Sequence, residues 1–207
     1  MKCFIEKLIS KQDLSDGEMG SAFDTIMSGG ANDTLIGAFL VALRAKGEKP
    51  SEIASAARIM REKALRVDVD FDVVDTCGTG GDGALTFNIS TAVAFVLAGA
   101  GLKVAKHGNR SVSSSSGSAD CLEALGVPID LDPQQAADAL KDGGFAFMFA
   151  PRYHPSMRHA MPARKQLGMK TIFNILGPLT NPAGAAYQVI GVYQEDLIDP
   201  IIEGLRL

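Results

Sequence analysis

Hydrophobic residues recur at helical spacing through the first 66 residues of the chain. A Ser15–Glu18 pair with capping-box spacing precedes an apolar helical face that ends near Gly30. The same spacing returns over residues 32–47 and 50–64, and no strand pattern interrupts it. The sequence therefore predicts a helical domain over residues 1–66.

From residue 71 onward, short apolar runs with β-type residues alternate with helical patterns. We expect strands at residues 71–75, 103–106, 145–150 and 187–193, and helices at 89–101, 118–125, 133–141 and 195–205. Strands that alternate with helices indicate βαβ units and a parallel sheet covered on both faces. The predicted fold class is α/β, with an N-terminal helical domain followed by a parallel-sheet domain over residues 71–207.

Composition places the chain among ordinary globular proteins. It is 46% hydrophobic and carries a formal net charge of −4. Its longest apolar stretches fall far short of the ~20 residues that span a bilayer, so we expect no membrane span. Three widely spaced cysteines favour reduced thiols and a cytoplasmic protein over a disulfide framework or a zinc site.

The acidic residues are unevenly distributed along the chain. Residues 83–119 and 143–194 contain no Asp or Glu, although together they carry eight Lys or Arg residues and all three histidines. The remaining residues therefore sum to a charge of −12. An acidic protein that excludes carboxylates from two long segments is expected to gather those segments around an anionic ligand, unless the pattern reflects chance clustering of buried segments.

A glycine-rich loop over residues 77–83 follows the first predicted strand. It matches the dinucleotide pattern G-x-G-x-x-G, but no acid follows about 20 residues later to bind a ribose. Its amides can still approach phosphate oxygens, although a plain structural turn is the alternative. The next helix begins at residues 88–91, where Asn88 or Ser90 can cap the helix and a hydroxyl can ligate Mg²⁺.

A basic cluster at residues 106–110 and a serine-rich run at 111–118 follow the second predicted strand. Lys106 would supply a point charge for phosphate, and the serines would supply hydroxyls and amides, although such a run can also be a flexible linker. His107 alone is more often structural than catalytic. In the second acid-free segment, one of Arg152, Arg158 and Arg164 could bind a carboxylate with its planar fork.

Four strings in this order, at residues 78–82, 88–91, 106–114 and 174–179, resemble the anthranilate phosphoribosyltransferases of tryptophan biosynthesis. The resemblance covers essentially the whole chain and implies transfer of the phosphoribosyl group of phosphoribosyl pyrophosphate (PRPP) to the amine of anthranilate, with Mg²⁺ as cofactor. It also implies a homodimer that packs through the helical domain, which helices from residues 152–175 would join. The family continues beyond these residues, so the sheet is expected to be incomplete, and the resemblance leaves open whether the isolated chain is active.

The resemblance also implies site residues. Lys106 and Arg164 would be catalytic, Ser90 would face Mg²⁺, and Asn109 and Arg164 would bind anthranilate. The full set of implied substrate-binding residues is Gly78, Gly81, Asp82, Thr86, Asn88, Ile89, Ser90, Thr91, Lys106, His107, Gly108, Asn109, Arg110, Ser111, Val112, Ser113, Ser114, Ser118 and Arg164.

The residues alone are also compatible with two other functions. A non-catalytic relative could bind nucleic acid or another phosphate ligand in the same basic region, although the first acid-free segment offers only Phe87 and Phe95 for base stacking. A nucleoside phosphorylase of related architecture would share the layout but not the four strings.

Overall fold

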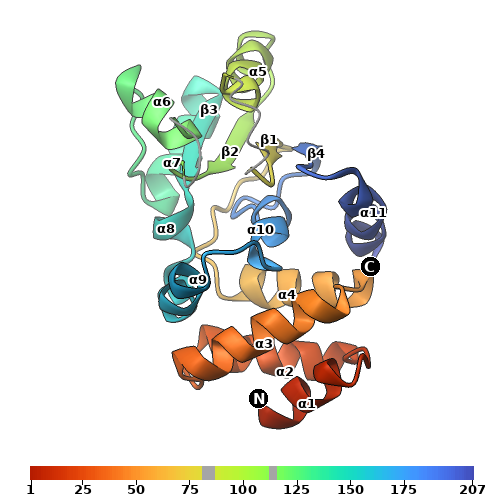
Figure 1. Cartoon of the computed structure of the whole chain (residues 1–207). Helices are drawn as coiled ribbons and strands as arrows, with labels where there is room; N and C mark the ends of the chain where they lie inside the picture. The colour runs from red at the N-terminus through yellow and green to blue at the C-terminus, as the bar shows by residue number, and fades with distance from the viewer. Residues whose placement is uncertain (81–86, 112–115) are drawn as a thin grey trace. The chain divides into compact units, whose positions relative to one another are not determined.

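The computed structural model describes residues 1–80, 87–111 and 116–207, which fall into two compact units. The first unit contains residues 1–64, 155–180 and 194–207, and the second contains residues 65–154 and 181–193. Figure 1 follows the chain through both units.

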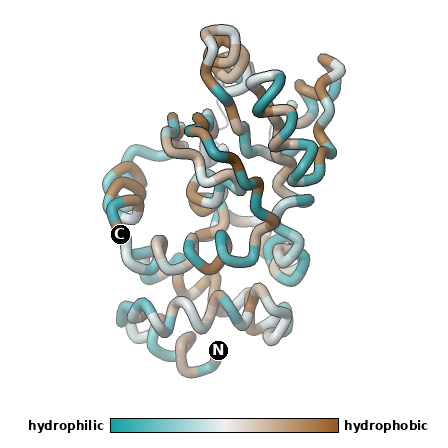
Figure 2. The backbone as a smooth tube through the Cα atoms, turned by 180° about the vertical axis from the view of Figure 1, so that it is seen from behind, coloured by the Kyte–Doolittle hydropathy of each residue, from teal (hydrophilic) through white to brown (hydrophobic). Residues whose placement is uncertain are grey.

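The first unit is helical. Its N-terminal part consists of α1 (Lys2–Ile9), α2 (Asp16–Met27), α3 (Asp33–Lys46) and α4 (Pro50–Glu62). Later segments add the 3-10 turn η1 (Pro155–His159), α9 (Met161–Leu167), α10 (Phe173–Leu176), η2 (Gly177–Leu179), η3 (Glu195–Leu197) and α11 (Ile198–Arg206). Helix α1 packs on α3, while α2 and α11 pack on α4. Hydrophobic and hydrophilic positions alternate along the helices near the N-terminus, as amphipathic helices require (Figure 2).

The capping box predicted at the start of α2 is confirmed. The Ser15 hydroxyl accepts from the Glu18 amide at 3.3 Å, and the Glu18 carboxylate accepts from the Ser15 amide at 2.8 Å. Phe23 then lies in the core of this unit, where its ring centroid is 6.3 Å from that of Phe39 and 5.4 Å from that of Phe173. Residues far apart in the sequence therefore share one helical core.

The second unit contains a four-stranded sheet. Its strands are β1 (Val74–Gly78), β2 (Val104–Gly108), β3 (Phe145–Phe149) and β4 (Tyr187–Gly191), in the order β3-β2-β1-β4. All three strand pairs are parallel, which confirms the predicted α/β fold class. Its helices are α5 (Ile89–Gly99), α6 (Ser118–Ala124), α7 (Pro133–Gly143) and α8 (Ala150–Tyr153).

Helices cover both faces of this sheet. On one face, Phe145 stacks on Phe95 of α5 with ring centroids 5.1 Å apart, and Phe147 packs with α6. On the other face, Ala105 and Met148 pack with α7. Neighbouring residues of β2 and β3 thus point to opposite faces, and both sets are largely buried, whereas Tyr187 and Val189 of the edge strand β4 are exposed.

The first strand begins three residues later than the sequence pattern predicted. Residues 71–75 were expected to form it, whereas the ladder with β4 runs from Val74 to Gly78. Phe71 instead packs against the cluster beneath α7. The polar Asp75 and Thr76 are buried inside the strand, so the apolar run alone placed it too early.

Within the described parts of the chain, no helix is long and apolar enough to cross a membrane.

Candidate functional site at the strand ends

The two loops singled out in the sequence leave the same edge of the sheet. Strands β1 and β2 are parallel and end at Gly78 and Gly108, so their carboxyl ends lie together. A Cβ on Gly78 would lie 3.2 Å from the Gly191 carbonyl oxygen, a tighter contact than strands normally allow. Glycine therefore lets β1 stay paired with β4 up to the point where the glycine loop begins.

Lys106 is buried at this edge. In the described part of the chain, its ammonium group forms hydrogen bonds to uncharged oxygens only. Its Nζ donates to the Thr76 carbonyl oxygen at 2.5 Å and to the Ser90 hydroxyl at 3.2 Å. Burial lowers the pKa of Lys106, and the nearby charge of Asp75 opposes that shift only in part. A desolvated ammonium of this kind gains most from an added anion.

The start of α5 connects the strand ends to the serine loop. Asn88 occupies the N-cap position, but its side chain makes no capping bond, in contrast to the capping role expected from the sequence. Its amide nitrogen instead lies 3.4 Å from the Ser116 hydroxyl and 3.5 Å from the Gly117 carbonyl oxygen, and donates to both. Thr91 is buried and donates to the Ser118 hydroxyl at 3.1 Å. The first turn of α5 is thereby tied to the end of the serine loop.

Asp120 holds the two ends of the serine loop together. Its Oδ2 accepts from the Ser111 amide at 3.2 Å and from the Gly117 amide at 2.8 Å. A Cβ on Gly117 would lie 2.3 Å from the Ser111 nitrogen, so only glycine fits this close approach. Arg110 also donates to Asp120 and to Glu123, at 2.8 and 2.9 Å, and these bonds raise its pKa. The positive charge of Arg110 is thus already paired with carboxylates.

Four further predicted residues lie around these loops. His107 is buried, donates its backbone amide to Asp75 and places its ring 5.0 Å from that of His154. Asn109 is exposed, and its side chain accepts from the Arg110 amide at 2.7 Å. Ile89 is half exposed at the start of α5, and Gly108 lies against Phe147, whose ring would be 2.9 Å from a Cβ at that position.

Six predicted residues, namely Gly81, Asp82, Thr86, Val112, Ser113 and Ser114, lie outside the described residues. The remaining predicted residues of the glycine and serine loops all belong to the second unit.

Arg164 belongs to the first unit, on helix α9. Its guanidinium carbon lies 5.1 Å from the centre of the Phe173 ring, and Nη1 is 3.6 Å from the Met161 sulfur. Burial lowers the pKa of Arg164. By contrast, Arg152 forms an ion pair with Asp130 at 2.6 Å. Of these two arginines, Arg164 is the one whose described contacts include no carboxylate.

Ser90 is the single predicted ligand of Mg²⁺ among the described residues. Its hydroxyl oxygen accepts one bond from Lys106 and retains a second lone pair. No group of three or more His, Cys, Asp or Glu side chains that could hold a metal ion occurs in residues 1–80, 87–111 and 116–207. Magnesium commonly keeps several waters and takes few protein ligands beside substrate phosphates. Ser90 therefore fits Mg²⁺ as one ligand in a shell that phosphate oxygens and water would complete.

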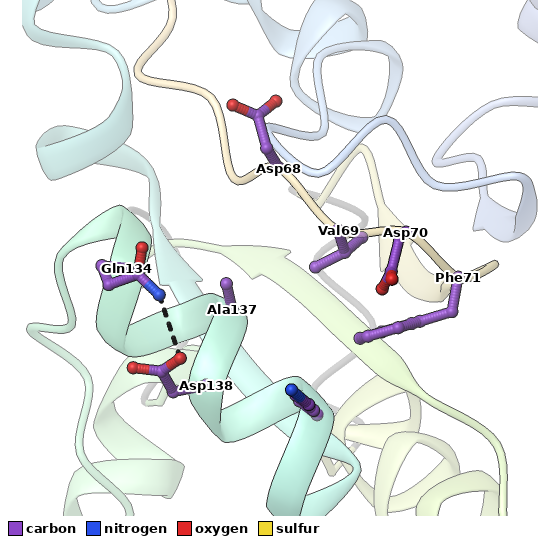
Figure 3. Close-up of a pocket in the computed structure, with 8 residues that line it drawn as sticks. Asp68, Val69, Asp70, Phe71, Gln134, Ala137 and Asp138 are labelled. Carbon is purple, nitrogen blue, oxygen red and sulfur yellow. Dashed lines mark hydrogen bonds between the residues drawn. The ribbon is translucent and has the colours of Figure 1, made fainter.

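A concavity of the second unit lies elsewhere. A cavity of about 440 Å³ is lined by residues 68–71 and by Gln134, Ala137, Asp138 and Lys141 of α7 (Figure 3). Gln134 donates to Asp138 at 3.0 Å, and Asp68 and Asp70 come from the segment before β1. Three carboxylates against one lysine disfavour an anion here, and none of the predicted site residues lines this cavity.

Sequence reasoning missed three residues that organise the strand ends, namely Asp75, Thr76 and Asp120. Asp75 and Thr76 are the polar members of an otherwise apolar strand, and a buried polar residue in a strand requires a hydrogen-bond partner. Asp120 lies three residues after Gly117, the spacing at which a carboxylate reaches back to the amide preceding a helix. These two local signals could have identified them.

Comparisons with known proteins agree with this architecture. Residues 70–206 match a glycosyl transferase family α/β domain, and residues 2–64 match the helical bundle domain of that family. Anthranilate phosphoribosyltransferase of Persephonella marina is 56% identical over 209 residues, which cover 100% of this chain and 62% of the relative. The chain thus spans about three fifths of the length of that curated relative.

Solved structures give the same result. Anthranilate phosphoribosyltransferase from Thermus thermophilus has a TM-score of 0.93 and 45% identity, over 98% of this chain and 62% of that one. The Saccharomyces cerevisiae enzyme in complex with PRPP and Mg has a TM-score of 0.90 and 33% identity, over 98% and 61%. A further structure of the yeast enzyme is in complex with 4-fluoroanthranilate, with a TM-score of 0.85 and 31% identity, over 98% and 59%.

Proposed function

The chain belongs to the glycosyl transferase family defined by these α/β and helical bundle domains, and we propose that it performs the reaction of the anthranilate phosphoribosyltransferases it resembles. In that reaction the amine of anthranilate displaces pyrophosphate from C1 of PRPP and gives N-(5-phosphoribosyl)anthranilate, a step of tryptophan biosynthesis. The chain spans 62% of the Persephonella relative, so this activity is a proposal for the protein.

The observation that carries the proposal is Lys106, a buried ammonium hydrogen-bonded to neutral oxygens at the carboxyl ends of parallel strands. Ligands of open parallel sheets bind beyond these ends. Departure of pyrophosphate places negative charge on the leaving group and positive charge on the ribose. Lys106 would stabilise the leaving group, and the amides at the start of α5 would add to that effect.

Ser90 would hold Mg²⁺. When bound, this ion would supply positive charge that stabilises the negative pyrophosphate oxygens. This assignment is supported by the spare lone pair of the Ser90 hydroxyl and by the magnesium in the yeast relative. The other predicted loop residues would bind PRPP through their amides and hydroxyls, except Asn109, which would bind anthranilate.

Arg164 would bind the carboxylate of anthranilate. Its half-buried guanidinium, whose described contacts are an aromatic ring and a sulfur, supports this role, because a carboxylate would give this cation an anionic partner. No strong base is needed, since the aniline nitrogen of anthranilate is already neutral.

We also propose that the protein forms a homodimer through the helical domain and works in the cytoplasm. Ile9 of α1 is 67% exposed and Val41 of α3 is 39% exposed, which gives the first unit apolar surface to bury. Cys3, Cys77 and Cys121 are all free thiols, as in a reducing compartment. Light scattering coupled to size-exclusion chromatography would measure the oligomeric state.

The proposed function is tested with the 207-residue chain in two steps. Isothermal titration calorimetry with PRPP and MgCl₂ measures donor binding, and the fall of anthranilate fluorescence measures turnover. Saturable binding of PRPP with consumption of anthranilate would support the proposal. A chain that shows neither PRPP binding nor turnover would overturn it for these residues.

A further inference from the structure

Thr76 is a buried polar residue in the middle of β1, between Asp75 and Cys77. It is 1% exposed. Burial of a hydroxyl is unfavourable unless it forms a hydrogen bond, so the partners of Thr76 show what it contributes.

Both oxygens of Thr76 are bonded, and both contacts lead to the strand-end site. The Thr76 hydroxyl donates to the Ser90 carbonyl oxygen at 2.7 Å, and the Thr76 carbonyl accepts from Lys106 Nζ at 2.5 Å. Lys106 Nζ also donates to the Ser90 hydroxyl at 3.2 Å. The three residues therefore form a closed hydrogen-bonded ring between β1, β2 and the first turn of α5.

The bond to Ser90 fixes more than one side chain. A carbonyl oxygen has two lone pairs, so the Ser90 carbonyl can accept a backbone hydrogen bond of the helix and also one from the Thr76 hydroxyl. This second bond attaches the first turn of α5 to β1. It also keeps the Ser90 hydroxyl within hydrogen-bond distance of Lys106.

We propose that Thr76 is a positioning residue for the PRPP site. Its hydroxyl holds the first turn of α5 in the position from which Ser90 and Lys106 together contact the diphosphate of PRPP. This inference rests on the proposed function. Thr76 itself does not touch the substrate, and its effect passes through the backbone of Ser90.

The chain offers a clean substitution for this test. Thr76→Val keeps the branched shape and removes the hydroxyl, whereas Thr76→Ser keeps the hydroxyl. Loss of one neutral hydrogen bond predicts PRPP affinity about three- to tenfold weaker for Thr76→Val, and Thr76→Ser should return within about twofold of the unsubstituted chain. Thr180→Val is the matched control, because buried Thr180 likewise donates to a carbonyl oxygen, that of Gly177 at 3.1 Å, in the first unit.

Hydrogen exchange gives a second readout that does not need PRPP. In Thr76→Val the amides of the first two turns of α5 should exchange about three- to tenfold faster, while amides of β3 keep their protection. Faster exchange confined to α5, reversed in Thr76→Ser, supports the positioning role even for a chain that binds no PRPP, an outcome that would count against the proposed function alone. Unchanged exchange in α5, or PRPP affinity equal to that of the unsubstituted chain, overturns the proposal. Should Thr76→Val lose cooperative thermal unfolding, Thr76→Ala is measured against the same criteria.

Discussion

The two units each contain a buried lysine, and the partners of the two lysines differ in charge. In the first unit Lys46 donates to Asp13 at 2.7 Å and to Glu52 at 2.8 Å. Burial alone would lower its pKa, but the two carboxylates outweigh burial and raise it. In the second unit Lys106 donates to two neutral oxygens, and burial leaves its pKa lowered.

This contrast separates a structural buried charge from one that is available to a ligand. An ammonium already paired with two carboxylates gains little from a phosphate, whereas an ammonium held by neutral dipoles gains a great deal. The same distinction divides the arginines of the acid-free segments. Arg110 is paired with Asp120 and Glu123, which lie just outside the first segment, while Arg164 lies against an aromatic ring. Counting charges along the sequence therefore overstated the free positive charge.

The strongest test of the structural lysine is to remove its buried partner. Glu52 is fully buried and also accepts from the Leu14 and Lys49 amides, so Glu52→Ala leaves Lys46 with only the exposed Asp13 as a carboxylate partner. We expect the free energy of unfolding to fall by about 3–5 kcal/mol, measured by urea denaturation followed by circular dichroism. Glu62→Ala, at an exposed position of the same helix, should change it by no more than about 0.5 kcal/mol. A loss below about 1 kcal/mol for Glu52→Ala would remove the contrast between the two lysines.

Removing Lys106 should have the opposite effect to removing Glu52: stability should be kept, and affinity for PRPP should fall. Lys106→Met takes away a desolvated charge, so the free energy of unfolding should stay unchanged or rise, by up to about 1 kcal/mol. Affinity for PRPP should fall by about 10- to 150-fold, as for a lost charged hydrogen bond. The control is Lys103→Met, because Lys103 bonds to the Lys141 carbonyl oxygen and lies over Phe71. Equal PRPP affinity in Lys106→Met and the unsubstituted chain would show that Lys106 is structural as well.

The corresponding test in the first unit concerns the geometry of a cation. Arg164→Lys keeps the charge but loses the planar fork, so anthranilate affinity should fall by about 5- to 20-fold in a calorimetric titration with PRPP present. Arg158→Lys serves as its partner variant, since Arg158 is exposed and donates to His159. If both variants bind anthranilate like the unsubstituted chain, the carboxylate is bound elsewhere.

The sequence predicted the arrangement of the second unit better than the contacts within its site. Alternating apolar runs placed β2, β3 and β4 within about two residues of their observed ends, because strand cores are fixed by local hydrophobicity. Strand β1 was misplaced, since its paired residues include Asp75 and Thr76, whose burial depends on partners from β2, β4 and α5. For the same reason, no pattern along the chain showed that Lys106 and Ser90 bond to each other, or that Arg110 is already paired.

The smallest expected effect tests an exposed counterpart of the buried Glu52. Glu18 lies at the surface of the same unit, where hydrogen bonds from Lys7 and from Ser15 lower its pKa to about 2. A depressed carboxylate pKa adds stability above the unfolded value of about 4.3, and that stability is lost as the pH falls toward about 2. The melting temperature of Glu18→Gln should therefore lie slightly below that of the unsubstituted chain at about pH 7, and the difference should close between about pH 5 and pH 2. Glu6→Gln, at an exposed position of α1, should show no such closure. Two results would mean that burial is not what separates the two carboxylates. One is a loss in the free energy of unfolding for Glu18→Gln as large as that for Glu52→Ala, and the other is a melting-temperature difference that persists at about pH 2.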